Sequence, residues 1–258
     1  SMVLVTRKAA TFRNVAAFRV TSTMEKVCSM RWLRERPCIV VPNAVEPEAF
    51  YPCPDRHDEF RRQYGIPSGA RVLITVTLFD WMKRVDLLMD CLARFASWRL
   101  VLVGDDRKGT APALKQHARA VGVAERVIWT GHLEGDSLRM ALSASDLFAL
   151  ISETENFGNV VVEAMMCGVP VLISKQVGVA EFIGDLPFVS IVENSVESIA
   201  RSVLYFERTW ISDVLQTSRI RESAIQRFSP ESVAERFMSS LQGILYQTPQ
   251  LQRDSRGN

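Results

Sequence analysis

The chain has 258 residues, of which 47% are hydrophobic and 23% are charged, and its net charge is +2. This length and balance allow one or two ordinary hydrophobic cores, and no apolar run in the sequence is long enough for a membrane-spanning helix. The five cysteines are widely spaced without a Cys-x-x-Cys pair, which argues against a zinc site or a disulfide framework and favours reduced thiols in a cytoplasmic protein.

Charge is unevenly distributed along the chain. Residues 1–36 carry a net charge of +6, which leaves −4 for the remainder because the whole chain carries +2. A basic segment of this kind could contact phospholipid headgroups, whereas the simpler interpretation is a solvated segment or a surface that a larger domain covers. The body of the chain has no basic stripe interleaved with aromatic residues, so nucleic acid is not an expected partner.

The first 43 residues offer too few elements for a second domain. Their pattern predicts a strand at 17–21, a helix at 24–33 and a strand at 38–41. A turn is expected at 42–45, followed by an irregular link that four prolines punctuate up to Pro67.

From residue 72 onward, short apolar runs alternate with longer amphipathic stretches. The runs cover residues 72–76, 100–103, 127–130, 147–151, 169–174 and 188–192. Short runs that are nearly continuous in apolar residues are typical of central parallel strands covered on both faces. The alternation therefore predicts an α/β domain with a doubly wound, Rossmann-like parallel sheet.

Helices are predicted where apolar side chains recur at steps of three and four residues. One stripe runs from Val85 to Phe95, and another begins at Val196, with Asn194 as its expected N-cap. A final helix is expected to open at Ser229 and Pro230, with its apolar stripe facing inward (Val233, Phe237, Leu241 and Ile244). From Thr248 onward we expect a polar, disordered tail.

A strand, a polar loop and a helix follow one another in the middle of the chain. The helix is predicted over 159–167, with Gly158 before it and Gly168 after it. Ligands of doubly wound sheets bind beyond the carboxyl ends of the strands, where helix N-termini favour an anion. Gly158, Asn159 and Val160 are therefore candidates for binding a diphosphate through backbone N–H groups.

Glu163 is the charged exception in this otherwise apolar helix. The helix is expected to be buried, and a lone buried carboxylate is costly unless a partner satisfies it. Composition alone leaves two interpretations equally supported. A structural lysine or arginine holds Glu163, or the carboxylate accepts hydrogen bonds from ligand hydroxyls.

The spacing Glu155-x7-Glu163, with Gly158 before the helix and Gly168-x-Pro170 after it, resembles the signature of retaining glycosyltransferases of family 4, which adopt the GT-B fold. Shorter matches follow in the family's order: Pro42-Asn43-Ala44-Val45, Leu102 to Asp105, Arg126 to Gly131, Ala144 to Phe148, and Gly178-x-x-Glu181. Their order and spacing make the resemblance specific. It implies the C-terminal half of such an enzyme, with the N-terminal domain largely absent.

The resemblance also implies a division of the chain. Residues 1–43 would be a remnant of the N-terminal domain together with the interdomain link. Residues 44–247 would form the nucleotide-sugar-binding, Rossmann-like domain, and residues 248–258 the disordered tail.

Roles for individual residues follow from the same resemblance. Glu163 corresponds to the glutamate that binds the ribose hydroxyls, and Glu155 to the one that faces the donor sugar near its anomeric centre. Lys83 corresponds to the lysine that neutralises the departing diphosphate, and Gly131 belongs to the base-binding edge. Because a placed cation can stabilise an anionic leaving group, and no Asp-x-Asp motif stands near these loops, no metal and no other cofactor is expected.

Two positions depart from the family pattern. The family's second diphosphate-binding cation, an arginine after the first strand, is Leu78 here. Either Arg84 or another cation replaces it, or the diphosphate is stabilised less strongly. The second glycine expected after Gly104 is Asp106, which puts close approach of the backbone to a ligand in doubt. The three histidines are scattered and suggest neither a catalytic triad nor a metal site (His57, His117 and His132).

The leading hypothesis is the metal-independent, retaining transfer of a sugar from a nucleotide-diphospho-sugar, expected to be a UDP-sugar, in polysaccharide biosynthesis. The acceptor, a glycan or glycolipid, would bind the missing domain. The isolated chain is expected to be a cytoplasmic monomer that binds nucleotide but is inactive in transfer, with peripheral contact at the inner face of the membrane as the role considered for the basic segment.

The alternatives are a non-catalytic nucleotide-sugar-binding or interaction module derived from this family, which Leu78 favours, and a Rossmann-like domain without nucleotide affinity.

Overall fold

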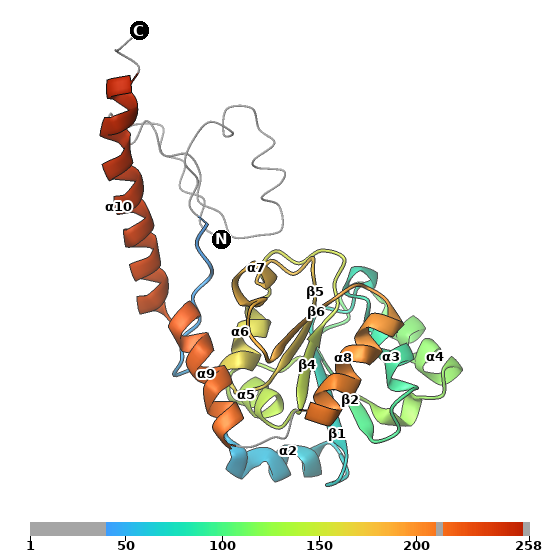
Figure 1. The fold of residues 1–258 in the computed structure, drawn as a ribbon. Helices are drawn as coiled ribbons and strands as arrows, with labels where there is room; N and C mark the ends of the chain where they lie inside the picture. Colours follow the sequence, from blue (N-terminus) through green and yellow to red (C-terminus); the bar gives the residue numbers. More distant parts are fainter. Residues whose placement is uncertain (1–39, 210–213, 255–258) are drawn as a thin grey trace.

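The computed structural model describes residues 40–209 and 214–254 (Figure 1). Six parallel strands form one sheet in the order β3-β2-β1-β4-β5-β6. Their bounds are β1 (Arg71–Val76), β2 (Trp98–Val103), β3 (Val127–Gly131), β4 (Leu147–Leu150), β5 (Val171–Ser174) and β6 (Val189–Val192). The predicted doubly wound α/β fold is confirmed, and each strand lies within two residues of its predicted bounds.

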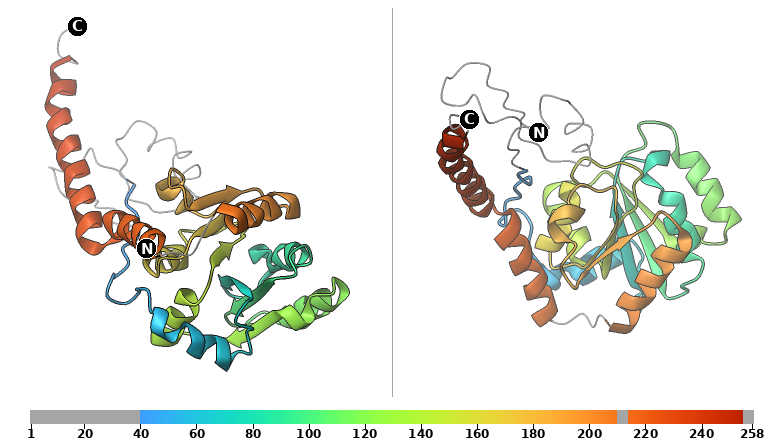
Figure 2. Two further views of the ribbon diagram at one scale, coloured as in Figure 1. Left: turned by 60° about the horizontal axis from the view of Figure 1, so that its bottom comes forward. Right: turned by 45° about the horizontal axis from the view of Figure 1, so that its top comes forward.

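Helices cover both faces of the sheet, as two views from other directions show (Figure 2). One layer contains α3 (Val85–Leu92), α4 (Ala111–Ala120) and α8 (Val196–Thr209). The other contains α2 (His57–Gln63), α5 (Gly135–Ser143), α6 (Asn159–Met166), α7 (Ala180–Ile183) and α9 (Val214–Phe228). Short 3-10 turns precede α2, α3 and β3, namely η1 (Pro54–Arg56), η2 (Trp81–Lys83) and η3 (Ala124–Arg126).

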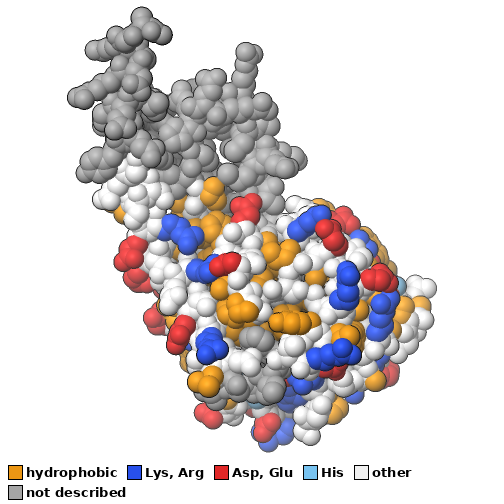
Figure 3. Space-filling view, viewed as in Figure 1, with side chains coloured by type: hydrophobic (Ala, Val, Ile, Leu, Met, Phe, Trp, Pro, Cys, Tyr) orange, Lys and Arg blue, Asp and Glu red, His pale blue; other side chains and the backbone are white. Residues whose placement is uncertain are grey.

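Alternate residues of the central strands β2, β1, β4 and β5 enter two separate hydrophobic cores. In β1, Val72 and Ile74 pack on the side of α5 and α6, whereas Leu73 packs on the side of α3 and α8. Both faces are buried, which explains why the strands read as continuous apolar runs. β6 forms one edge of the sheet, where Ile191 is 43% exposed and apolar side chains gather in the middle of the face shown in Figure 3.

Several predicted elements differ from the structure near the start of the chain. The elements predicted at 17–21 and 24–33 lie outside the described residues, and of the strand predicted at 38–41 only Val40 and Val41 are described, without strand structure. Helix α2 forms within the stretch predicted to be an irregular link, because Phe60 is completely buried in the core.

The N-cap predicted for the helix that begins at Val196 is wrong. The hydroxyl of Ser195 accepts a hydrogen bond from the backbone N–H of Ser198 at 3.3 Å, which is the capping interaction. Asn194 instead donates its side-chain amide to the carbonyl of Ser152 at 3.3 Å, so a tertiary contact across the sheet has replaced the local one.

Helix α10 (Pro230–Asp254) begins with the predicted cap, since Ser229 accepts from the backbone N–H of Ser232 at 3.2 Å. Its stripe does not enter the core as predicted. Val233, Phe237 and Leu241 are only partly buried, because the helix extends away from the sheet (Figure 2). The helix also continues to Asp254, where a disordered tail from Thr248 was predicted. Among the described residues, no helix combines the length and apolarity needed to cross a membrane.

Candidate functional site

The order of the strands reverses between β1 and β4, so the loops that follow these two strands diverge to opposite faces of the sheet. Crevices outside the carboxyl ends of strands at such switch points are the usual ligand sites of open α/β sheets. The two loops are held together by the carbonyl of Met82, which accepts from the backbone N–H of Glu153 at 2.8 Å and from the hydroxyl of Ser152 at 3.2 Å.

Two predicted site residues meet at this switch point. The ammonium group of Lys83 lies 2.7 Å from a carboxylate oxygen of Glu155, and the two side chains are 19% and 23% exposed. Lys83 ends η2 in the loop after β1, and Glu155 lies in the loop after β4. The tertiary structure therefore places a cation and a carboxylate side by side, where each is accessible to a ligand.

Arg84 lies next to this pair in a left-handed backbone conformation with φ of 44°. Its guanidinium binds the carboxylates of Asp86 at 3.0 Å and Glu153 at 3.2 Å. Its positive charge is therefore already balanced in this structure. Leu78, which stands where an arginine was expected, exposes 48% of its surface on the same loop.

The loop that carries Glu155 is fastened to the loop that follows β5. Glu155 donates its backbone N–H to the carbonyl of Gln176 at 3.3 Å, and its own carbonyl accepts from the backbone N–H of Gly178 at 3.2 Å. A Cβ atom at position 178 would lie 2.1 Å from the carbonyl oxygen of Asn156, so this approach requires glycine. The backbone N–H and carbonyl of Glu155 are thus both bonded to the loop that follows β5.

Helix α6 begins next to this loop. Gly158 is its N-cap, with φ of +88°, and no side chain caps the helix. The backbone N–H of Val161 bonds to the carbonyl of Gly158 at 2.9 Å, and the side-chain carbonyl of Asn159 accepts from the amide of Asn43 at 2.7 Å. The first turn of α6, with Asn159 and Val160, therefore presents uncapped backbone donors that suit an anion.

Glu163 lies one turn further along α6, which is buried as expected. Burial raises the pKa of its carboxyl from 4.5 to about 7. Across residues 40–209 and 214–254, no hydrogen bond or ion pair satisfies this carboxyl group, so the structure offers no support for the interpretation that a lysine or arginine holds it. The interpretation that hydroxyl groups of a ligand satisfy Glu163 stays a prediction.

The loops after β2 and β3 also lie at the carboxyl ends of the strands. The carbonyl of Gly131 accepts from the backbone N–H of Gly104 at 2.9 Å, and Gly131 itself is exposed with φ of +73°. Asp106, in place of the expected glycine, caps α4 by accepting from the backbone N–H groups of Thr110 at 2.6 Å and Ala111 at 3.0 Å. The departure at Asp106 thus has a structural role.

Two supporting contacts escaped sequence reasoning. Ser152 and Ser174 form a buried pair, in which the hydroxyl of Ser174 donates to the carbonyl of Ser152 at 2.7 Å and accepts from its backbone N–H at 2.9 Å. The only available signal was a serine at the end of each apolar run. The bond from Asn43 to Asn159 left no signal, because 116 residues separate the two side chains. The described part of the chain contains no group of three His, Cys, Asp or Glu side chains suited to a metal ion.

Comparison with known proteins identifies the family of the chain and its fold. The family model of group 1 glycosyl transferases matches residues 56–227, which is more than half of the chain. A curated relative, N-acetyl-alpha-D-glucosaminyl L-malate synthase of Bacillus anthracis, is 27% identical over 192 residues, which cover 72% of this chain and 49% of the relative. The chain thus spans about half the length of this relative.

Solved structures share the fold. The crystal structure of Anabaena Alr3699/HepE in complex with UDP and glucose superposes with a TM-score of 0.73 at 21% identity, over 87% of this chain and 62% of that one. The C-terminal domain of LpcC, a group 1 family glycosyl transferase of Francisella tularensis, superposes with a TM-score of 0.58 at 21% identity, over 70% of this chain and 94% of that domain.

Proposed function

Because the chain belongs to the group 1 glycosyl transferases, we propose that it is the donor-binding half of an enzyme that transfers a sugar from a nucleotide-diphospho-sugar to an acceptor. The observation that carries the proposal is the contact between Lys83 and Glu155 at the switch point of the sheet. A cation and a carboxylate, each about one-fifth exposed, suit a ligand that carries a diphosphate next to a sugar.

The proposed donor lies across the carboxyl ends of the strands, with its nucleoside towards Glu163 and Gly131. Two acceptor oxygens on Glu163 can receive the protons of neighbouring ribose hydroxyls. The diphosphate lies at the start of α6, against the backbone of Gly158, Asn159 and Val160, where N–H donors and the helix dipole favour negative charge. Solved structures of the Anabaena protein with UDP and with UDP-glucose support a uridine nucleotide.

In the proposed reaction the bond between the anomeric carbon and the diphosphate oxygen breaks, and an acceptor hydroxyl bonds to that carbon on the same face while its proton passes to the departing diphosphate oxygen. Negative charge grows on the departing diphosphate. Lys83 stabilises this charge through its ammonium group, without a metal ion. Glu155 accepts hydrogen bonds from sugar hydroxyls, which fixes the sugar beside the leaving group.

Arg84 is a weaker candidate for the second cation, because Asp86 and Glu153 already bind its guanidinium. Its contribution to diphosphate binding would require one of these carboxylates to move. This arrangement and Leu78 favour the second candidate function, a nucleotide-sugar-binding module without catalysis. We propose that the 258-residue chain binds nucleotide but does not transfer sugar, because the acceptor belongs to the other half of the enzyme.

The first test measures thermal stability in the presence of UDP, GDP and ADP and of their sugar conjugates. A nucleotide at a hundred times its Kd should stabilise the chain by about 2.7 kcal/mol, whereas no shift with any of them contradicts the proposal. The second test measures transfer by a full-length enzyme before and after Lys83→Ala and Glu155→Ala. An active parent that either change inactivates excludes the binding-only alternative.

A further inference from the structure

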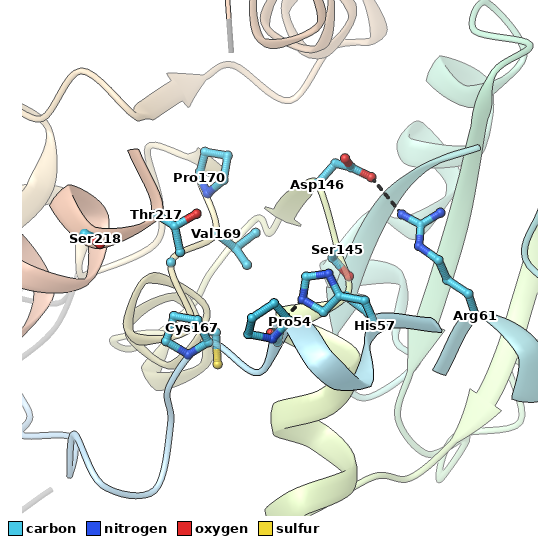
Figure 4. A pocket seen from close by; sticks show the side chains of 14 residues that line it. Pro54, His57, Arg61, Ser145, Asp146, Cys167, Val169, Pro170, Thr217 and Ser218 are labelled. Carbon is cyan, nitrogen blue, oxygen red and sulfur yellow. Dashed lines mark hydrogen bonds and ion pairs between the residues drawn. The ribbon is translucent and has the colours of Figure 1, made fainter. Parts of the chain in front are cut away.

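A cavity of about 350 Å³ lies at the amino ends of the strands, on the opposite side of the sheet from Lys83 and Glu155, which follow the carboxyl ends. Asp146 and Pro170 belong to its lining and immediately precede β4 and β5, so the cavity sits at the amino ends of these strands. Figure 4 shows Thr217 from α9 and Pro170 facing His57 from α2 across it. The volume is at the lower end of the range for small-molecule sites.

The charged groups of the lining balance one another. Arg61 binds Asp146 at 3.4 Å, and the same carboxylate accepts the backbone N–H of Val72 at 2.7 Å. Burial, with the nearby Arg61 adding to it, lowers the pKa of His57 below 6.5, so its imidazole is neutral at neutral pH. A charged ligand would therefore find no uncompensated partner on this wall and would lose its hydration.

Hydrogen-bonding groups of the lining retain unused capacity. One imidazole nitrogen of His57 contacts the hydroxyl of Ser143 at 3.0 Å, which also accepts from the backbone N–H of Cys53 at 2.7 Å. The second nitrogen of this ring has no bond to another residue of the described ranges, and neither do the hydroxyls of Thr217 and Ser218. A neutral imidazole and two hydroxyls can each donate or accept.

The rest of the lining consists of compact, ring-shaped apolar groups and helix ends. Pro52, Pro54 and Pro170 present saturated rings, and Val169 adds an aliphatic surface. The C-terminal ends of α5 and α6 reach the same wall, and the carbonyl groups at helix C-termini favour hydrogen-bond donors. A ligand that matches this wall is compact and uncharged, with apolar faces and several hydroxyl groups.

From this balance of groups we propose that the cavity binds an uncharged saccharide of one or two rings. The C–H faces of the sugar pack against the prolines, and its hydroxyl groups bond to His57, Thr217 and Ser218. This site is separate from the proposed nucleotide-sugar site, and it does not depend on the proposed function.

The test uses the 258-residue chain and saturation-transfer NMR with three sugars of matched shape. Methyl glucoside is neutral, glucosamine is cationic and glucuronate is anionic. We expect saturable binding of methyl glucoside in the millimolar range and clearly weaker binding of the two charged sugars. UDP at saturating concentration should leave the methyl glucoside signal unchanged, because the two sites lie at opposite ends of the strands.

Variants locate the binding. Ser218 is an exposed residue of α9 that borders the cavity, so Ser218→Trp should block it without disturbing the core and weaken binding by about tenfold or more. The matched control Ser218→Ala removes one hydroxyl and should weaken binding by about threefold. His57→Phe keeps a ring in place while removing both nitrogens, and it should also weaken binding severalfold.

Four outcomes would overturn the proposal. The first is absence of saturable methyl glucoside binding at tens of millimolar, and the second is tighter binding of either charged sugar. The third is methyl glucoside binding that survives Ser218→Trp while the variant unfolds at the same temperature as the parent, which would place the sugar elsewhere. The fourth is displacement of methyl glucoside by UDP, which would place the sugar at the carboxyl ends of the strands.

Discussion

The ammonium of Lys83 and the carboxylate of Glu155 satisfy one another across the switch point of the sheet, 2.7 Å apart and 72 residues apart in sequence. Each group is therefore already paired before a donor binds. A diphosphate that takes up Lys83 must compete with Glu155 for it, whereas sugar hydroxyls can bond to Glu155 in place of the ammonium. If the chain binds a nucleotide as proposed, its affinity for the nucleotide should depend on both residues.

The ion pair itself should make a small contribution to folding. Both side chains are partly exposed, so solvent screens their attraction. Urea unfolding of Lys83→Met, Glu155→Gln and the double variant should give a coupling free energy of about 1 kcal/mol without nucleotide. Additive single effects would show that the pair contributes nothing to the free energy of unfolding.

Removing the negative charge of Glu155 should strengthen the binding of UDP. Glu155→Gln frees Lys83 and removes a repulsive carboxylate near the diphosphate, so we expect UDP to bind about threefold to tenfold more tightly by calorimetry at low salt. Uridine, which lacks phosphates, should bind with unchanged affinity. The matched control is Asp185→Asn. Asp185 lies on the loop before β6 and pairs with Arg227 of α9, so this change removes an ion pair and should leave UDP affinity unchanged. Weaker UDP binding to Glu155→Gln would contradict the proposed arrangement.

Glu163 should make the free energy of unfolding fall as pH rises. Its pKa of about 7 in the folded chain exceeds the ordinary value of 4.5, so the folded state binds one more proton than the unfolded state between these values. Its contribution to stability is complete below pH 4.5 and is lost as pH rises to 7, by roughly 3 kcal/mol in all. Glu163→Gln removes this loss, so its advantage over the parent in urea unfolding should grow from pH 5 to pH 8.

A parallel response of the parent and Glu163→Gln to pH would refute this assignment. The same titration can be repeated with saturating UDP. If ribose hydroxyls bond to the ionised carboxylate of Glu163, UDP should lower its pKa, and the affinity for UDP should fall as pH decreases below 7.

Gly178 should be intolerant of even a methyl group. A Cβ atom would lie 2.1 Å from the carbonyl oxygen of Asn156, so Gly178→Ala must separate the two loops that hold Glu155. We expect a loss of about 1–3 kcal/mol in stability and weaker UDP binding. Gly69→Ala is the control, because nothing lies within 4 Å of its added Cβ, and it should behave as the parent in both measurements. Parent-like stability of Gly178→Ala would show that the loops are not in contact.

Local patterning in the sequence was enough to determine the strands, most of the helices that were predicted, and the class of fold. Apolar runs and stripes report burial directly, and Ser229 capped its helix as predicted because the interaction involves only neighbouring residues. Asn194 was assigned wrongly for the opposite reason. Its side chain was within reach of Ser152, 42 residues away, and no local pattern records that contact.

The site shows the same division. Sequence spacing placed Glu155, Glu163 and Gly158 together on one loop and helix, and Lys83 was assigned only by resemblance. Tertiary structure alone decided that Lys83 reaches Glu155, that Asp86 and Glu153 occupy Arg84, and that no described basic group reaches Glu163. These outcomes depend on how the loops after separate strands converge, and that convergence arises only when the sheet packs between its two helical layers.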